Sequence, residues 1–256
     1  MKYLEKLMQM AVFSRKDVVE LAGSESAAHS ILYEYTKAGY IDRIRRNLYT
    51  AISFETKQSI ANRFQIASNI SEDSCIALHS AFEYYGFANQ VFHEIYVAAK
   101  TRFSNFNYDG IDYTRISPKI SSGIVKTNSG IKVTSLERTV IDNIYFFNRY
   151  GGLEELIRCI MMIPSLKQDK LIRFLDEYNQ SNLYQKTGYI LSEFSKQLGI
   201  DKEFFDYCKS RVPQSKQYLY TEKDSLYKSF VLQEDWKLYA PESIITIIEK
   251  GAIHDT

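Results

Sequence analysis

The stretch from Phe13 to Tyr49, FSRKDVVELAGSESAAHSILYEYTKAGYIDRIRRNLY, decides how the chain is interpreted. Its first part predicts a short helix, because apolar residues recur there at helical spacing. Ser14 can cap that helix, since a serine oxygen accepts a hydrogen bond from one of the unpaired N–H groups of the first turn. Gly23 can end it, because glycine readily adopts the left-handed conformation at the position that follows a helix.

A second helix and a hairpin follow in the same stretch. Ser24 or Ser26 can begin the helix, and Gly39 can end it. Strand-like residues then flank residues 45–47 (RRN), and asparagine tolerates the positive φ that a tight hairpin turn requires. Helix, glycine-containing turn, helix and basic-tipped hairpin is the order of a winged helix-turn-helix. The stretch therefore predicts a DNA-binding domain.

The candidate DNA contacts lie on the outer face of the second helix and at the hairpin tip. They have short polar, aromatic or basic side chains: Ser26, His29, Ser30, Tyr33, Lys37, Arg43, Arg45, Arg46 and Asn47. The positive charge is local, because residues 1–52 hold eight Lys/Arg against six Asp/Glu, a balance of +2, whereas the whole chain carries +1. A clustered basic tip favours binding to one DNA site over general coating of nucleic acid. The alternative is that this stretch has only a structural role, since many small domains contain two helices and a hairpin.

The composition is that of a globular protein, with 45% hydrophobic and 25% charged residues in 256. No apolar run is long enough to cross a bilayer, and the first residues lack the pattern of a signal peptide. Cys75, Cys159 and Cys208 have neither zinc-site nor disulfide-framework spacing. We therefore expect a cytoplasmic protein with no membrane partner. Four histidines at no ligand spacing lead us to expect no metal and no cofactor.

The expected fold class is α+β (mixed α/β), with an N-terminal winged helix-turn-helix followed by a larger α/β domain that ends in helices. Residues 53–56 (SFET) form the expected boundary, so residues 1–54 would be the DNA-binding domain and residues 55–256 the larger domain. Strand-like runs dominate residues 95–133, and amphipathic helical periods dominate from residue 151 onward.

A helix is also predicted near Thr134. Threonine at this position and Glu137 three residues later form the pattern of a capping box. Arg138 and Asp142 lie four residues apart on the same helix. The simplest interpretation of that spacing is an i,i+4 ion pair worth a few tenths of a kcal/mol.

Three segments in this order resemble the AbiE-type abortive-infection antitoxins, the AbiEi family. They are GYIDRIRRNLY (39–49), HSA (79–81) and TSLERTVID (134–142), and the resemblance spans roughly Val12 to Leu198. The Glu-Arg-Thr part of the last segment is the most specific piece. Two features depart from that family: Asn47 stands where a glycine is usual, and residues after about 200 match less well.

The resemblance implies a cytoplasmic DNA-binding antitoxin of a type IV toxin–antitoxin pair in antiviral defence. Such a protein represses transcription of its own operon. The expected partners are double-stranded DNA of its own promoter, with inverted repeats, and a nucleotidyltransferase-like toxin that is countered without a stable complex. The only residues that the resemblance carries over are those of the DNA-binding stretch. A separate interpretation of the later helix makes four residues a possible antitoxin surface that contacts toxin or nucleic acid: Thr134, Glu137, Arg138 and Asp142.

The sequence also argues against two kinds of enzyme. A two-metal nuclease needs clustered carboxylates near a lysine, and the acidic residues of the β-rich section lack that spacing. His79 and Ser80 are adjacent on a predicted helix and point about 100° apart, so they cannot act as a base and nucleophile pair. We therefore expect no enzyme and no catalytic residues. A ligand-sensing winged-helix transcription regulator, with the α/β domain as effector domain, is the alternative function.

Overall fold

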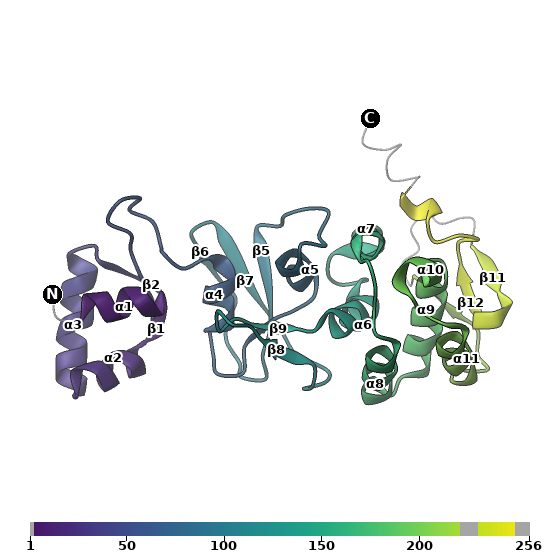
Figure 1. The fold of residues 1–256 in the computed structure, drawn as a ribbon, viewed down its shortest axis with the longest axis horizontal. Helices are drawn as coiled ribbons and strands as arrows, with labels where there is room; N and C mark the ends of the chain where they lie inside the picture. Colours follow the sequence, from purple (N-terminus) through teal and green to yellow (C-terminus); the bar gives the residue numbers. More distant parts are fainter. Residues whose placement is uncertain (1–2, 221–229, 249–256) are drawn as a thin grey trace. The chain divides into compact units, whose positions relative to one another are not determined.

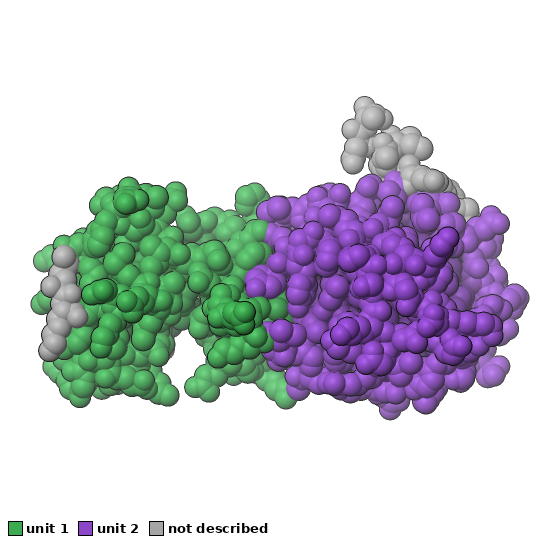
Figure 2. Space-filling view, viewed as in Figure 1, with its two compact units in different colours: residues 1–76, 93–118, 126–133 green, residues 77–92, 119–125, 134–256 purple. Residues whose placement is uncertain are grey.

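The computed structural model describes residues 3–220 and 230–248, and over these residues the chain is mixed α+β, as predicted (Figure 1). The chain divides into two compact units, coloured separately in Figure 2. Unit 1 comprises residues 1–76, 93–118 and 126–133, and unit 2 comprises residues 77–92, 119–125 and 134–256. The expected boundary between residues 54 and 55 therefore falls inside unit 1, because the chain stays in that unit after residue 54 and returns to it twice.

The N-terminal module, residues 3–54, combines helices with a three-stranded antiparallel sheet. Its elements are α1 (Leu4–Met10), β1 (Val12–Ser14), α2 (Arg15–Ala22), α3 (Glu25–Lys37), β2 (Ile41–Arg45) and β3 (Leu48–Ala51). The strand order is β1-β3-β2, with β3 antiparallel to both neighbours. Helices α2 and α3 pack against each other, joined by a tight turn (Figure 1).

Local sequence signals fix the ends of α2 and α3. The Ser14 Oγ accepts from the Asp17 N–H at 3.3 Å, and the Asp17 carboxylate accepts from the Ser14 N–H at 2.6 Å, which completes a capping box. Gly23 ends α2 with φ 82°, in the left-handed region. Ser24 caps α3 by accepting a backbone N–H of its first turn at 3.2 Å. The predicted ends are thus confirmed, with Ser24 and not Ser26 as the cap of α3.

A small apolar core holds the module together. Its buried residues come from helices and strands alike: Leu4, Leu7, Phe13, Val18, Ala28, Leu32, Ile41 and Ala51. The β2–β3 hairpin turns at Asn47, whose φ of 64° is the positive value that its sequence predicts. The pairing register shifts between Arg43 and Arg45, as in a β-bulge. One side of α3 and the hairpin tip are left to solvent.

A mixed six-stranded sheet follows, and most of its residues belong to unit 1. This section contains α4 (Arg63–Ser68), β4 (Cys75–Ile76), β5 (Glu94–Ala98), β6 (Phe106–Tyr108), β7 (Ile111–Ile116), β8 (Ile124–Lys126) and β9 (Lys132–Thr134). The strand order is β6-β7-β5-β4-β9-β8. Strand β5 runs parallel to β7 and antiparallel to β4, and β4 runs parallel to β9. Strand β5 is buried at residues 95–98 (IYVA), which explains the continuous apolar run there.

Unit 2 is mainly helical. Its elements are α5 (His79–Tyr85), α6 (Leu136–Phe146), α7 (Gly152–Met162), α8 (Gln168–Tyr178), α9 (Ser181–Ser192), α10 (Ser195–Leu198), α11 (Lys202–Ser210), β10 (Gln217–Tyr218), β11 (Val231–Gln233), the 3-10 helix η2 (Glu234–Trp236) and β12 (Leu238–Ala240). Apolar faces of α6, α7, α8, α9 and α11 share one core. Across residues 3–220 and 230–248, each helix is too short or too polar to span a membrane.

The small sheet β10-β12-β11 of unit 2 and the adjoining η2 pack against helix α9. The ring of Trp236 packs on Gly188, where an added Cβ would lie 2.1 Å from a ring carbon. The Gln185 Nε2 donates to the Lys237 carbonyl at 2.8 Å, and the Tyr189 hydroxyl donates to the Pro241 carbonyl at 2.6 Å. The absence of a side chain at Gly188 is therefore what allows the sheet to approach the helix.

Candidate functional site

The five candidate DNA contacts of α3 share its exposed side. All five are exposed: Ser26, His29, Ser30, Tyr33 and Lys37. The opposite side of the helix presents Ala28 and Leu32 to the core of the module. Because His29, Tyr33 and Lys37 follow one another at four-residue steps, they form one stripe along the helix. Tyr33 is 62% exposed, so a large aromatic ring stands in solvent at the middle of this stripe.

An open pocket of about 380 Å³ lies along this stripe and against the β2–β3 hairpin. Residues of α2, α3, β2 and β3 line it: Arg15, His29, Leu32, Tyr33, Thr36, Lys37, Arg43 and Tyr49. The fold therefore brings the helix stripe together with Arg43 of the hairpin. Ser26 and Ser30 lie on the exposed side of α3 but outside this lining, and the Ser30 hydroxyl donates to the Ser26 carbonyl at 3.2 Å.

Besides the apolar Leu32, three lining residues with polar groups were not among the predicted contacts: Arg15, Thr36 and Tyr49. Arg15 occupies the first turn of α2, where a basic side chain opposes the helix dipole. That unfavourable placement is the signal that could have singled it out. In the structure the Arg15 Nε donates to Glu25 Oε2 at 3.0 Å, across the turn between α2 and α3. Its charge is thus partly compensated within the module.

The hairpin tip faces a different pocket, of about 660 Å³. Arg45, Arg46 and Asn47 line it together with the start of α2 and with residues 69–72 and 101–103, all within unit 1. Arg46 and Asn47 are exposed. The nine candidate DNA contacts therefore do not form one continuous lining: Arg43 joins the α3 stripe, and the tip residues stand apart from it.

Arg45 differs from its neighbours because it is half-buried. Its guanidinium lies over the rings of Phe103 and Phe106, 5.2 Å and 5.0 Å from their centroids. Burial lowers the pKa of Arg45, and its Nη1 has no hydrogen-bond partner among the described residues. At the other end of β2, the Tyr108 hydroxyl donates to Asp42 Oδ2 at 3.1 Å. Arg45 therefore anchors β2 to the β6 region of unit 1, and Arg46 is the more exposed of the two tip arginines.

The residues of the candidate antitoxin surface are buried. Their exposed fractions are 0% for Thr134, 6% for Glu137, 1% for Arg138 and 4% for Asp142. The prediction that they form a surface is therefore wrong. The physical reason is that unit 2 covers α6 on nearly all sides, so that residues 137–144 are buried without a break. Their polar groups consequently bond to one another and to the surrounding backbone.

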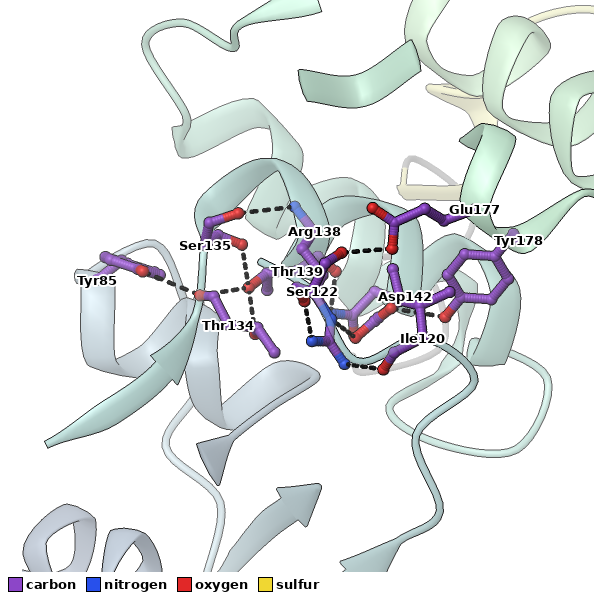
Figure 3. Close-up of polar contacts among 11 residues, drawn as sticks. Tyr85, Ile120, Ser122, Thr134, Ser135, Arg138, Thr139, Asp142, Glu177 and Tyr178 are labelled. Atoms are coloured by element: carbon purple, nitrogen blue, oxygen red, sulfur yellow. Dashed lines mark hydrogen bonds and ion pairs between the residues drawn. The ribbon is translucent and has the colours of Figure 1, made fainter. Parts of the chain in front are cut away.

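Arg138 is the centre of this buried network (Figure 3). Its Nε donates to Asp142 Oδ2 at 3.2 Å, and its terminal nitrogens donate to the carbonyls of Ile120, at 3.1 Å, and of Ser122. The Tyr178 hydroxyl of α8 donates to Asp142 Oδ1 at 2.6 Å. Arg138 therefore ties residues 120–122 to α6, and Asp142 ties α8 to the same helix.

The electrostatics of the network follow from its burial. Burial raises the pKa of Asp142, while the Arg138 guanidinium and the Tyr178 hydroxyl act to lower it. Burial also raises the pKa of Tyr178, and the adjacent Asp142 carboxylate raises it further. Gly123 lies close to Arg138 with φ 70°, and an added Cβ there would be 2.6 Å from the Phe174 ring. The guanidinium and its backbone partners are thus packed without room for a larger side chain.

The start of α6 lies one residue later than predicted. Ser135, not Thr134, is the N-cap, and its Oγ accepts from the Arg138 N–H at 3.4 Å. Thr134 ends strand β9, and its Oγ1 lies 2.7 Å from the Thr139 Oγ1. The Tyr85 hydroxyl donates to the Thr134 carbonyl at 2.9 Å, and burial raises the pKa of Tyr85 to about 12. Thr134 therefore joins the strand to α5 and α6, in place of the capping role that we predicted.

Glu137 likewise has a different role from the predicted one. Its Oε1 accepts from the backbone N–H of Lys167 at 3.3 Å, just before α8. Its Oε2 lies 3.6 Å from the Lys170 Nζ. Glu137 therefore holds the start of α8, and the predicted capping box with Thr134 is wrong.

The fold has a counterpart among solved structures. The crystal structure of the RV2827C protein from Mycobacterium tuberculosis is similar to this chain with a TM-score of 0.64 and 13% sequence identity. The similarity covers 97% of this chain and 93% of that protein. At this identity the likeness concerns the fold alone. No protein-family model matches the sequence, and no curated protein sequence matches it.

We expect Arg138→Met to destabilise the protein by about 3–5 kcal/mol, because it leaves the Asp142 carboxylate buried without its cation. Arg173→Met is the matched control, since Arg173 and Glu177 form a pair with the same four-residue spacing and the same 3.2 Å distance at the surface. That change should cost less than about 1 kcal/mol. Urea unfolding of both variants measures the difference. Equal small losses would show that the buried network does not hold unit 2 together.

Proposed function

We propose that the N-terminal module is a winged helix-turn-helix that binds double-stranded DNA, with α3 as the recognition helix and β2–β3 as the wing. The observation that carries the proposal is the pocket in which the polar stripe of α3 meets Arg43 of the hairpin. The element order supports it as well, because two packed helices are followed by a hairpin that pairs with β1.

The dimensions and chemistry of α3 fit this role. Its 13 residues span about 20 Å, and the B-DNA major groove, about 12 Å wide, admits a helix of this kind. His29 and Tyr33 are exposed hydrogen-bonding side chains that can reach base edges or phosphates. Lys37 lies in the last turn of the helix, where a cation is favoured by the helix dipole and can reach a phosphate.

We further propose that the DNA is the promoter of the protein's own operon and that the protein is the antitoxin of a type IV pair. This part rests on the resemblance of residues 39–49, 79–81 and 134–142 to AbiE-type antitoxins. Because Thr134, Glu137, Arg138 and Asp142 of the last segment are buried, we assign this segment to the scaffold of unit 2. The surface that counters a nucleotidyltransferase-like toxin would then lie elsewhere on the protein.

The wing assignment is tested by separating Arg46 from Arg45. Arg46→Ala should reduce the slope of log affinity against log salt by about 1, because an exposed cation that neutralises a phosphate contributes about −0.9. Arg45→Ala should leave that slope nearly unchanged and instead lower the unfolding free energy by about 0.5–2 kcal/mol, since it removes two ring contacts. Gel shifts at several salt concentrations and urea unfolding provide the two readouts. Equal slope changes in both variants would contradict the structural distinction between the arginines.

The recognition helix is tested at two residues of its exposed stripe. His29→Ala and Tyr33→Ala should each weaken binding to the promoter by about 1 kcal/mol, the typical net contribution of one hydrogen bond, while the salt slope stays the same. Glu34→Ala is the control, because Glu34 is exposed on α3 but does not line the pocket. Fluorescence anisotropy with promoter DNA and with a scrambled duplex gives the affinities. If Glu34→Ala is as harmful as the other two changes, α3 does not read DNA through this stripe.

The antitoxin assignment is tested by growth rescue with the full-length chain. The neighbouring toxin and each antitoxin variant are expressed from separate inducible promoters, so that rescue cannot depend on repression of the operon. A Lys37→Ala, Arg46→Ala double variant should lose at least about tenfold in promoter affinity, a loss of about 1.4 kcal/mol, yet rescue growth as well as the wild type. Absence of rescue by the wild-type chain would remove the antitoxin assignment and favour a ligand-sensing regulator. It would leave the DNA-binding proposal standing.

A further inference from the structure

A second buried polar cluster lies in unit 2, where α5 meets α7. It consists of His79, Glu155 and Cys159, whose exposed fractions are 2%, 7% and 0%. The His79 Nε2 lies 2.9 Å from Glu155 Oε1, and the Cys159 Sγ lies 3.4 Å from the same oxygen. One nitrogen, one oxygen and one sulfur atom thus lie within 4.8 Å of one another. The proposed DNA-binding function makes no use of this cluster.

The cluster is not fully satisfied by its own hydrogen bonds. By hydrogen-bond geometry, His79 Nδ1 and Glu155 Oε2 are buried without a partner among the described residues, although the backbone N–H of Gln90 lies close enough to the Glu155 carboxylate to lower its pKa. A buried polar atom without a partner costs about 1–3 kcal/mol, and buried carboxylates occur mainly where they are paired or bind a metal. Phe92 stacks on the imidazole with ring centroids 3.9 Å apart, which covers one face of the ring. The cluster is therefore an enclosed set of atoms that could bind a metal ion, and not all of them are engaged in hydrogen bonds.

We propose that His79, Glu155 and Cys159 bind one divalent transition-metal ion, and that zinc is the ion these ligands fit best. Imidazole, carboxylate and thiolate are the ligands that zinc takes in proteins. A carboxylate and a thiolate carry two negative charges, so beside a neutral imidazole they neutralise a divalent ion. In the absence of an ion the Glu155 carboxylate is paired with His79. A bound ion would take over that pairing and would also stabilise the thiolate of Cys159, whose pKa burial raises.

Two of the three distances between ligand atoms are close to those of a tetrahedral zinc site, and the third is within 4.8 Å. With zinc–sulfur bonds of about 2.3 Å and zinc–nitrogen or zinc–oxygen bonds of about 2.0–2.1 Å, neighbouring ligand atoms stand roughly 3.3–3.6 Å apart. Two of the distances in the cluster, 2.9 Å and 3.4 Å, are within about half an ångström of this range. The fourth position would be taken by Oε2 of Glu155 or by a water. An ion would require the His79 nitrogen and the Cys159 sulfur, which lie within 4.8 Å of each other, to reach this range as well.

The sequence did not indicate this site, and we expected no metal. Glu155 and Cys159 lie four residues apart on α7, which places both on one face of the helix. His79 is the first residue of α5 and is separated from Glu155 by 76 positions. Motif spacing cannot reveal a ligand set that is assembled across such a distance. An ion bound here would tie the start of α5 to the middle of α7.

The test is a cobalt titration of the full-length protein after treatment with a chelator. We expect one equivalent of Co²⁺ to bind, with a sulfur-to-cobalt charge-transfer band and the intense visible absorption of tetrahedral cobalt. One equivalent of Zn²⁺ should abolish both. If the wild-type protein shows no charge-transfer band at stoichiometric Co²⁺, the proposal is overturned.

Matched cysteine variants identify the ligand. Cys159→Ser should lose the charge-transfer band, whereas Cys208→Ser should keep it, because Cys208 is equally buried but lies on α11. A band that persists in Cys159→Ser would sink the assignment. If Cys159→Ser is unfolded by circular dichroism, Glu155→Gln replaces it as the deciding variant. That protein should retain the band but bind Co²⁺ more than about tenfold more weakly, since even changes outside the ligand set cost about 10- to 100-fold. Unchanged affinity in Glu155→Gln would contradict the site.

Discussion

The buried guanidinium of Arg138 is the constraint on which unit 2 depends. A charge at 1% exposure is tolerated only when its hydrogen-bonding groups are matched, and Arg138 finds its partners on more than one segment. Asp142 comes from the same helix, and the carbonyls of Ile120 and Ser122 come from the preceding loop. The Tyr178 hydroxyl of α8 donates a hydrogen bond to the other oxygen of the Asp142 carboxylate. The loop and α8 must both be in place before the charge is satisfied. Burial of Arg138 therefore couples these segments more strongly than apolar contacts alone would.

Features set by neighbouring residues could be predicted from the sequence. The N-cap at Ser14 and the left-handed Gly23 involve groups within four positions of each other, and the turn at Asn47 needs only a residue that tolerates positive φ. The mixed fold class followed from periodicity in the same local way. In each case the interacting groups are close together in the sequence. The local sequence pattern alone is therefore almost sufficient to determine the local structure.

Features that depend on burial could not be predicted in this way. Arg138–Asp142 and Arg173–Glu177 have the same spacing and the same charges, yet one pair is buried and the other stands at the surface. Arg45 and Arg46 are adjacent and identical, but only Arg45 meets the rings of Phe103 and Phe106. In both comparisons the difference is tertiary. Segments that are distant in the sequence cover Arg138 and Arg45, but they do not cover Arg173 and Arg46. The shift of the α6 cap from Thr134 to Ser135 has a related cause. Thr134 is the last residue of strand β9, so the helix cap falls on the next residue.

The same reasoning bears on the proposed interaction with DNA. Of the basic residues at the α3 pocket and the hairpin tip, Arg15 is engaged by Glu25 and Arg45 is held over aromatic rings. That leaves Lys37, Arg43 and Arg46 to meet phosphates, and three such contacts would give a salt slope of roughly −3 for one protein chain. Attraction of this size is too weak to hold one copy of the protein on arbitrary DNA at physiological salt. Base-edge contacts from α3, or two copies on an inverted repeat, must then supply the remaining affinity, which is why a site-specific repressor fits this module better than a protein that coats nucleic acid.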